Sequence, residues 1–113
     1  MSLSQKALSG NVETFILSVL EDAPSYGYEI VSALNERAPD LVSFGEGTVY
    51  PVLHRMEKKK LLEAFWQEGA SGRKRKYYRV TRSGKKSLAE NLKEWRELAQ
   101  AMEQITGKRP LTT

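Results

Sequence analysis

The stretch that decides the fold is residues 47–58, GTVYPVLHRMEK. Its apolar side chains recur at spacings of three and four, which places them on one stripe of a helix. These side chains are Val49, Val52, Leu53 and Met56. Thr48 is a natural N-cap, and it would put Pro51 in the first turn, where backbone amides have no helical partner and proline is tolerated. The stretch therefore predicts a helix that begins just after Thr48.

The opposite face of this helix is suited to reading the edges of base pairs. At about 100° per residue, the side away from the apolar stripe carries a small residue, a stiff proline and polar side chains. Its members are Gly47, Pro51, His54 and Lys58, with Tyr50 and Arg55 at the flanks. Base edges are recognised by hydrogen-bond donors, acceptors and apolar contacts, and this face offers all three. A solvated amphipathic helix would explain the same pattern equally well.

Two amphipathic segments precede this stretch. Residues 5–21 repeat apolar side chains at helical spacing and predict a single helix. Pro24 interrupts the pattern, and Ser25 can cap a second helix that ends near Arg37. Gly27 falls on the buried side of that second helix, so we expect another backbone to approach it closely.

The pattern changes after the third helix. Residues 61–66 and 76–81 are short, aromatic-rich runs on either side of the sequence Gly69-Ala70-Ser71-Gly72, and they predict two antiparallel strands with a flexible tip. Thr81 can then cap a long last helix. The apolar residues of this helix follow a spacing of 4, 3, 4 and 3, which is typical of a helix-helix seam. They are Leu88, Leu92, Trp95, Ala99 and Met102.

This order of elements predicts a mainly α fold with a small β-hairpin. Three helices, a hairpin and a further helix describe a winged helix-turn-helix followed by a long C-terminal dimerisation helix, with the third helix placed to enter a major groove. We expect residues 1–81 to form the winged helix-turn-helix DNA-binding domain and residues 82–107 the dimerisation helix. Residues 108–113 are expected to form a flexible tail.

The charge distribution points to a polyanionic partner. Residues 1–47 carry two bases against seven acids, whereas residues 48–113 carry sixteen bases against seven acids. Residues 73–86 alone hold eight bases and no acid. Clustered lysine and arginine release counterions when they neutralise nucleic-acid phosphates, and here the cluster follows a candidate base-reading helix. We therefore expect Arg73, Lys74, Arg75 and Lys76 to contact duplex DNA.

The composition argues against enzymatic and metal chemistry. The chain has no cysteine and one histidine, so it lacks thiol nucleophiles, thiolate metal sites and a multi-histidine site within one chain. It also lacks a glycine-rich phosphate loop, and we expect no enzymatic activity, no cofactor and no metal. No apolar run approaches the roughly 20 residues that cross a bilayer, and the N-terminus does not resemble a signal peptide. These features predict a cytoplasmic protein that does not bind membranes.

Three segments together resemble the PadR family of transcriptional regulators, specifically its short members with one C-terminal helix. They are Tyr26–Ile30 (YGYEI), Gly47–Glu57 (GTVYPVLHRME) and Gly72–Thr81 (GRKRKYYRVT). The resemblance spans about residues 8–106 and implies a homodimeric repressor that binds a palindromic operator. It places Thr48, Tyr50, Pro51 and His54 at recognition positions, to which the helical face above adds Arg55 and Lys58. Lys60 stands where the family commonly has a glycine, which adopts a left-handed helix cap more easily than lysine.

The last helix predicts both a dimer interface and an effector site. Its apolar residues exceed what one small domain covers, and the first helix is expected to pack beside them. The dimerisation residues would be Leu8, Val12, Leu88, Leu92, Trp95, Ala99 and Met102. In short PadR-like regulators, planar aromatic or hydrophobic effectors can bind at the interface, and Trp95 matches a tryptophan often found there. We expect Trp95, Phe15, Val12 and Met102 to line such a site and the small molecule to release the repressor from DNA. Core packing is the alternative role for Trp95.

Two other functions are compatible with parts of this sequence. A winged helix can serve as a protein-interaction module without sequence-specific DNA binding, because fold alone does not determine function. The basic segment argues against that alternative. RNA binding is compatible with the charge, but the strands lack the interleaved glycine and aromatic signature of an RNA-recognition sheet.

Overall fold

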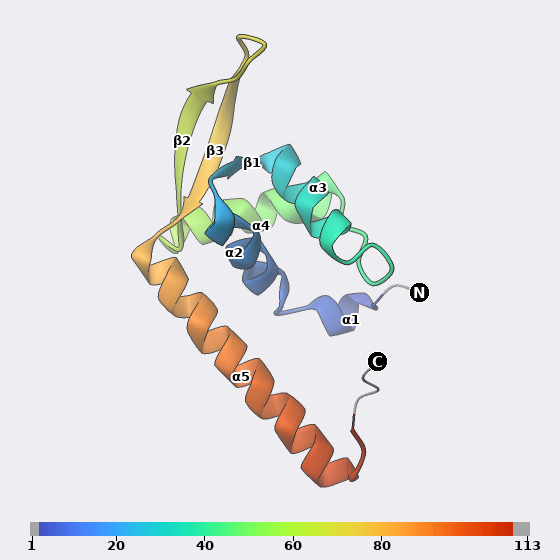
Figure 1. The fold of residues 1–113 in the computed structure, drawn as a ribbon. Helices are drawn as coiled ribbons and strands as arrows, with labels where there is room; N and C mark the ends of the chain where they lie inside the picture. The colour runs from blue at the N-terminus through green and yellow to red at the C-terminus, as the bar shows by residue number, and fades with distance from the viewer. Residues whose placement is uncertain (1–2, 110–113) are drawn as a thin grey trace.

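The computed structural model describes residues 3–109 as a helical body from which a hairpin and a long helix project (Figure 1). The elements are α1 (Gln5–Leu8), α2 (Val12–Asp22), β1 (Ser25–Tyr26), α3 (Gly27–Arg37), α4 (Glu46–Lys58), β2 (Leu62–Glu68), β3 (Lys74–Val80) and α5 (Arg82–Thr106). The predicted fold class, a winged helix-turn-helix with a long C-terminal helix, is confirmed. Of the expected tail, residues 110–113 lie outside the described residues, as do residues 1–2 of the predicted N-terminal domain.

The core lies where α2, α3 and α4 meet the inner face of the sheet. Its largest fully buried side chains are Ile16, Leu17, Ile30, Val49, Leu53 and Met56. All four members of the apolar stripe predicted for the third helix are buried, and the four residues predicted opposite them are exposed. Helical periodicity therefore orients α4 correctly, because one side of the helix must cover the core.

The N-terminal segment is not one helix, as the apolar spacing predicted, but two. The break lies at Gly10, whose φ of 85° is left-handed and easily adopted only without a side chain. Ser4 caps α1 by accepting a hydrogen bond from the Ala7 amide at 3.1 Å. Leu8 and Val12 both still pack against the core, so the apolar spacing continues across a break that it does not reveal.

The start of α3 also differs from the prediction. Ser25 is not the N-cap, since Ser25 and Tyr26 form β1, and Tyr26 occupies the cap position. The Tyr26 amide donates a hydrogen bond to Glu29 Oε1 at 3.1 Å. β1 pairs with β3, which turns the predicted hairpin into a three-stranded antiparallel sheet of order β1-β3-β2. A two-residue strand is too short for alternating hydrophobicity to signal it.

Helix α4 begins three residues before the predicted start. Gly45 is the N-cap in place of Thr48, so Pro51 lies in the second turn and has no amide to donate to the Gly47 carbonyl. The early start has a tertiary cause: the Asn35 side chain accepts from the Phe44 amide at 2.7 Å and donates to the Phe44 carbonyl at 2.9 Å. This clamp from α3 aligns the chain immediately before the helix.

The wing, defined as β2, β3 and the turn of residues 69–73, is longer than predicted. Its register runs from Leu62 opposite Val80 to Glu68 opposite Lys74. Lys60, which precedes it, has a φ of 64°, the left-handed conformation in which a glycine would be unstrained. The predicted cap of the last helix is confirmed, because Thr81 Oγ1 accepts from the Gly84 amide at 3.0 Å.

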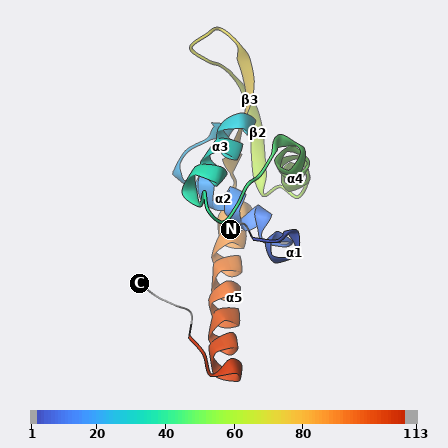
Figure 2. The same ribbon diagram turned by 90° about the vertical axis from the view of Figure 1, so that its right-hand side faces the viewer.

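Within the part of the chain that the structure describes, only the first part of α5 packs against other elements. Leu88 is buried in the core of its own chain, and Asn91 Nδ2 donates to Thr14 Oγ1 of α2 at 3.0 Å. Beyond that bond the helix runs away from the body, as both views show (Figures 1 and 2). None of the helices within residues 3–109 is both long and apolar enough to span a bilayer.

Candidate nucleic-acid interface

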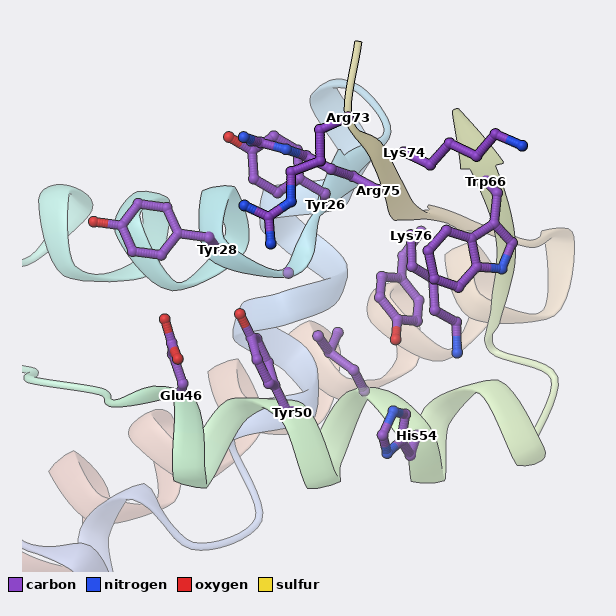
Figure 3. Close-up of a pocket in the computed structure, with 13 residues that line it drawn as sticks. Tyr26, Tyr28, Glu46, Tyr50, His54, Trp66, Arg73, Lys74, Arg75 and Lys76 are labelled. Carbon is purple, nitrogen blue, oxygen red and sulfur yellow. The ribbon is translucent and has the colours of Figure 1, made fainter. Parts of the chain in front are cut away.

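A cleft of about 680 Å³ opens between the start of α3, the exposed side of α4 and the wing (Figure 3). We call it the wing cleft. Six of the predicted contact residues line it: Tyr50, His54, Arg73, Lys74, Arg75 and Lys76. Residues more than twenty positions apart are thus brought together, because the hairpin after α4 folds back beside that helix. The cleft joins a polar helix face to a cationic strand.

The remaining residues predicted on α4 lie elsewhere. Thr48, Pro51 and Arg55 line a second groove of about 690 Å³ between α1 and α4. Lys58 is exposed near the end of the helix and lines neither groove. The exposed face of α4 is therefore one ridge with a groove on each side, and Pro51 and His54 fall on opposite sides of it.

Tyr50 is held in place by its neighbour Gly27. A Cβ atom at Gly27 would lie 2.7 Å from Tyr50 Cε1, so the glycine admits the tyrosine ring. The expected close approach at Gly27 is real, but the approaching group is this ring and not a backbone. Tyr50 is half-buried against the core, where burial raises the pKa of its hydroxyl and the nearby Glu46 carboxylate adds to the increase. The ring is therefore pre-positioned beside the cleft.

The four basic residues of the wing that line the cleft are not equivalent. Lys76 Nζ pairs with Glu57 Oε1 at 3.0 Å and lies 5.3 Å from the centre of the Tyr78 ring. Burial alone would lower the pKa of Lys76, but the bond to Glu57 and the contact with Tyr78 outweigh it and raise the pKa. The Arg75 guanidinium lies 4.3 Å above the Tyr26 ring. These two cations are engaged in the chain's own packing.

Arg73 and Lys74 are the wing cations most available to a partner. Both are exposed, and neither forms an ion pair with any residue of the 3–109 segment. They lie where the turn enters β3, at the outer end of the wing, and Figure 3 shows both at the upper rim of the cleft. An exposed cation can neutralise a phosphate without first breaking a contact within the protein.

The outer face of the sheet stiffens the wing. Tyr77 stacks on Phe65 at 5.6 Å between ring centres and meets Tyr26 edge-on at 5.5 Å. Arg79 closes the row, 4.7 Å above the Phe65 ring and 2.8 Å from Glu63 Oε1. Pairs of this kind stabilise a sheet beyond their buried area, so they hold β2, β3 and the end of β1 together.

Seven residues that line the wing cleft were not predicted as contacts. They are Tyr26, Gly27, Tyr28, Glu46, Leu53, Trp66 and Tyr78. Trp66 pairs with Lys76 across the hairpin, and strand alternation puts the two side chains on the same face, so the correct register would have revealed it. Glu46 lies on α4 only because the helix begins early, which its sequence does not signal.

The predicted effector residues are not together within one chain. The ring centres of Phe15 and Phe44 lie 6.3 Å apart. Phe15 also lines a small cavity of about 130 Å³ between α2 and α3. Val12 lines the groove between α1 and α4. Trp95 and Met102 are exposed on the projecting part of α5, at 60% and 56%.

The projecting part of α5 carries an apolar stripe that none of the other described residues, 3–109, covers. Leu92, Trp95 and Met102 belong to the predicted seam, and Leu98 and Ile105 extend it beyond the prediction. Ala99 lies half-buried on the same length of helix. Contiguous exposed apolar surface of this kind marks an interaction site. Within residues 3–109 no group of three acidic, histidine or cysteine side chains is arranged to hold a metal ion.

Comparisons with known proteins agree with this geometry. The family described as "Transcriptional regulator PadR-like family" matches residues 16–90. A transcriptional regulator of Clostridium thermocellum superposes with a TM-score of 0.81 at 30% identity, over 90% of this chain and 96% of that one. A PadR family transcription regulator of Clostridium difficile has a TM-score of 0.75 and 38% identity, over 86% and 99%. An uncharacterised protein of Lysinibacillus sphaericus is 36% identical, over 85% of this chain and 88% of that protein.

Proposed function

Because this chain belongs to the PadR-like family of transcriptional regulators, we propose that it binds duplex DNA in a sequence-specific manner through α4 and the wing. The observation that carries the proposal is the wing cleft, because residues from the exposed side of α4 and from the basic start of β3 line the same cleft. An α-helix fits the major groove of B-DNA, where each base pair presents a distinct pattern of donors and acceptors. The adjacent wing supplies charge for the phosphates.

Recognition and positioning would be divided between the two elements. On the wing-cleft side of α4, His54 and Tyr50 present polar groups for base edges, while Arg73 and Lys74 contact phosphates. On the other side of the ridge, Pro51 offers an apolar contact and Thr48 and Arg55 extend the surface, and Lys58 extends it near the end of the helix. Lys76 acts chiefly by holding the wing to α4 through Glu57.

We further propose that the protein is a homodimer. The projecting part of α5 exposes Leu92, Trp95, Leu98, Met102 and Ile105, and a second copy of the helix is the simplest cover for such a stripe. A two-fold dimer presents two copies of α4, which requires a palindromic operator with half-sites about one helical turn apart. Leu8 and Val12 would border this interface, and the buried Leu88 would anchor α5 to its own chain.

The regulatory part of the proposal concerns Trp95. A large ring near a two-fold axis either interlocks with its mate or leaves room for a planar ligand, and Phe15, Val12 and Met102 are the proposed neighbours. A planar aromatic effector that prefers one separation of the two α5 helices would change the spacing of the two α4 helices and release a repressor from DNA. A regulator of this kind acts in the cytoplasm, where the bacterial chromosome lies.

The DNA-binding part is tested with the variant Arg73→Ala/Lys74→Ala. Fluorescence anisotropy with a random-sequence duplex at several salt concentrations should show weaker binding and a slope of log K against log salt that is smaller by about one unit per lost phosphate contact. Lys93→Ala/Arg96→Ala removes the same charge from α5 and is the matched control. If both variants lose equal affinity, the effect is net charge and the wing is not a contact surface.

Sequence specificity is tested by selecting bound sequences from a random duplex library. A regulator should enrich one palindromic motif. Failure to enrich any motif would instead support the alternative of a winged-helix protein-interaction module.

The dimer is tested by light scattering of Leu92→Asp at micromolar concentration. The variant should have half the mass of the wild-type protein, because a carboxylate in the seam would be desolvated without a partner. Leu41→Asp makes the same change at another exposed leucine and should leave the mass unchanged. A wild-type monomer would contradict the dimer.

The effector site is tested by following Trp95 emission in a Trp66→Phe background during titration with planar aromatic compounds. Ligands that quench Trp95 should also lower operator affinity. If no compound does so, and Trp95→Ala reduces only stability, Trp95 is a packing residue.

A further inference from the structure

One carboxylate stands in the otherwise cationic wing cleft. Glu46 is the acidic residue among those that line it, in company with Arg73, Lys74, Arg75 and Lys76. It is the first residue of α4 and is exposed, and Figure 3 shows its side chain rising from that first turn toward the space between α3 and α4. A negative charge in this position repels a phosphate, so the cleft is not built for the DNA backbone alone.

Glu46 also differs from the acids around it. Glu57 is paired with Lys76, Glu63 with Arg79, and Glu29 accepts from the Tyr26 amide. Within residues 3–109, Glu46 has neither an ion pair nor a side-chain hydrogen bond. Its two oxygens are therefore available to a donor from outside the chain.

The chemistry of the major groove restricts what that donor can be. An ionised carboxylate only accepts hydrogen bonds, so it is attracted to an exocyclic amino group. Adenine presents its amino group beside the N7 acceptor, which would repel the second carboxylate oxygen, whereas cytosine presents the N4 amino group. Residues at the N-terminal end of a recognition helix are the ones that contact base edges in helix-turn-helix proteins.

We propose that Glu46 is a specificity residue that selects a cytosine in each half-site by accepting a hydrogen bond from its N4 amino group. The inference rests on the proposed binding of duplex DNA through α4. The same carboxylate would have two effects. It would favour the base pair that presents the cytosine amino group, and it would weaken binding to DNA that presents only phosphates or acceptors to it.

A purely structural role makes a different prediction. A carboxylate at the first helical residue interacts favourably with the positive end of the helix dipole, and Glu46 does so whatever it contacts. Loss of that interaction changes the melting temperature, but it does not change which base is preferred. Base preference is therefore the readout that separates the two roles.

The experiment selects bound sequences from a random duplex library with the full-length protein, Glu46→Gln and Glu36→Gln. Glu36 is an exposed acid near the end of α3 that does not line the wing cleft, so its variant matches the charge change. The wild-type and Glu36→Gln motifs should share a cytosine in each half-site. Glu46→Gln should replace it with adenine, because glutamine pairs with adenine N6 and N7, and Glu46→Ala should show no preference there.

Affinities for defined duplexes measure how strongly the protein prefers the selected cytosine. Replacing the selected cytosine should weaken wild-type binding about 5- to 150-fold, the range expected for one base contact, and should weaken Glu46→Ala binding much less. Glu46→Ala should also bind random duplex more tightly than Glu36→Gln does.

Three results would overturn the inference. If Glu46→Gln and Glu46→Ala select the wild-type motif, Glu46 does not read a base, although the DNA-binding proposal stands. A wild-type motif without the cytosine has the same consequence. If the wild-type protein enriches no motif at all, the inference falls together with the proposed function.

Discussion

Replacing Gly27 with alanine should damage both the fold and DNA recognition through a single contact. The added Cβ would lie 2.7 Å from Tyr50 Cε1, 3.2 Å from Cζ and 3.4 Å from Oη. Carbon atoms in comfortable contact are about 3.5–4.0 Å apart, so the ring must move by about 1 Å. Because Tyr50 is half-buried against the core, that movement also displaces its packing partners.

Two opposing contributions determine how far Gly27→Ala lowers the free energy of unfolding. Overpacking of this kind destabilises by about 1–3 kcal/mol, while alanine in a helix gains up to about 1 kcal/mol over glycine. The free energy of unfolding should therefore fall by about 1–2 kcal/mol. If the displaced ring also loses a base contact, operator affinity should fall by a further factor of about 5–150.

A double-mutant cycle with Tyr50→Ala isolates the contact. Urea denaturation should give a coupling energy of about 1–3 kcal/mol, because Gly27→Ala has nothing to collide with once the ring is absent. Gly47→Ala is the matched control: it lies in the first turn of α4, and its Cβ would meet nothing within 4 Å. If Gly27→Ala costs the same with and without the Tyr50 ring, the ring is not what requires the glycine.

Three further predictions concern the junctions around the wing. Gly84→Ala should lower the free energy of unfolding by about 3 kcal/mol or more, because the new Cβ would overlap the Leu61 carbonyl and lie 2.8 Å from Val80; an unchanged melting temperature would contradict this packing. Lys60→Gly should raise stability by about 1 kcal/mol, since a left-handed residue without a Cβ is unstrained, and a loss of stability would show that the lysine side chain matters more. For Lys76, whose pKa is raised in the folded state, the stabilising contribution is fully present below pH 10.5 and lost as the pH rises through the folded value. The difference in unfolding free energy between wild type and Lys76→Met should therefore be constant from pH 7 to 9 and shrink at higher pH, and a difference that grows there would refute the assignment.

Local interactions explain the parts of the fold that could be predicted. The buried and exposed faces of α4 follow from its own apolar spacing, and the cap at Thr81 follows from a hydroxyl three residues before the Gly84 amide. The pairing of two aromatic-rich runs around a glycine-containing turn predicts the wing. Each of these signals lies within a few residues of the structure it determines, so no knowledge of distant segments is needed.

Several residues of the candidate site could be predicted from the sequence, but their spatial arrangement could not. The basic run at Arg73 and the polar side chains of Tyr50 and His54 could be named from the sequence. The division of the predicted α4 contacts between two grooves could not be predicted, because it depends on where α1 and the wing lie relative to α4. The order of the elements and the charge asymmetry indicated the class of partner, while the identity of the free cations emerged only from the Glu57 and Tyr26 contacts that engage the others.

The sequence by itself determined which face of each helix is apolar, where α5 begins and which half of the chain is positive, because these depend on spacing and on local hydrogen bonds. The tertiary structure alone decided the break at Gly10, the strand at Ser25 and the early start of α4. Each of these depends on a partner distant in sequence or on a backbone choice that periodicity does not record: β3 supplies the mate of β1, and Asn35 clamps Phe44 before α4. Glu46 enters the wing cleft only because that clamp starts the helix three residues early, so its place beside the basic wing is a product of the fold.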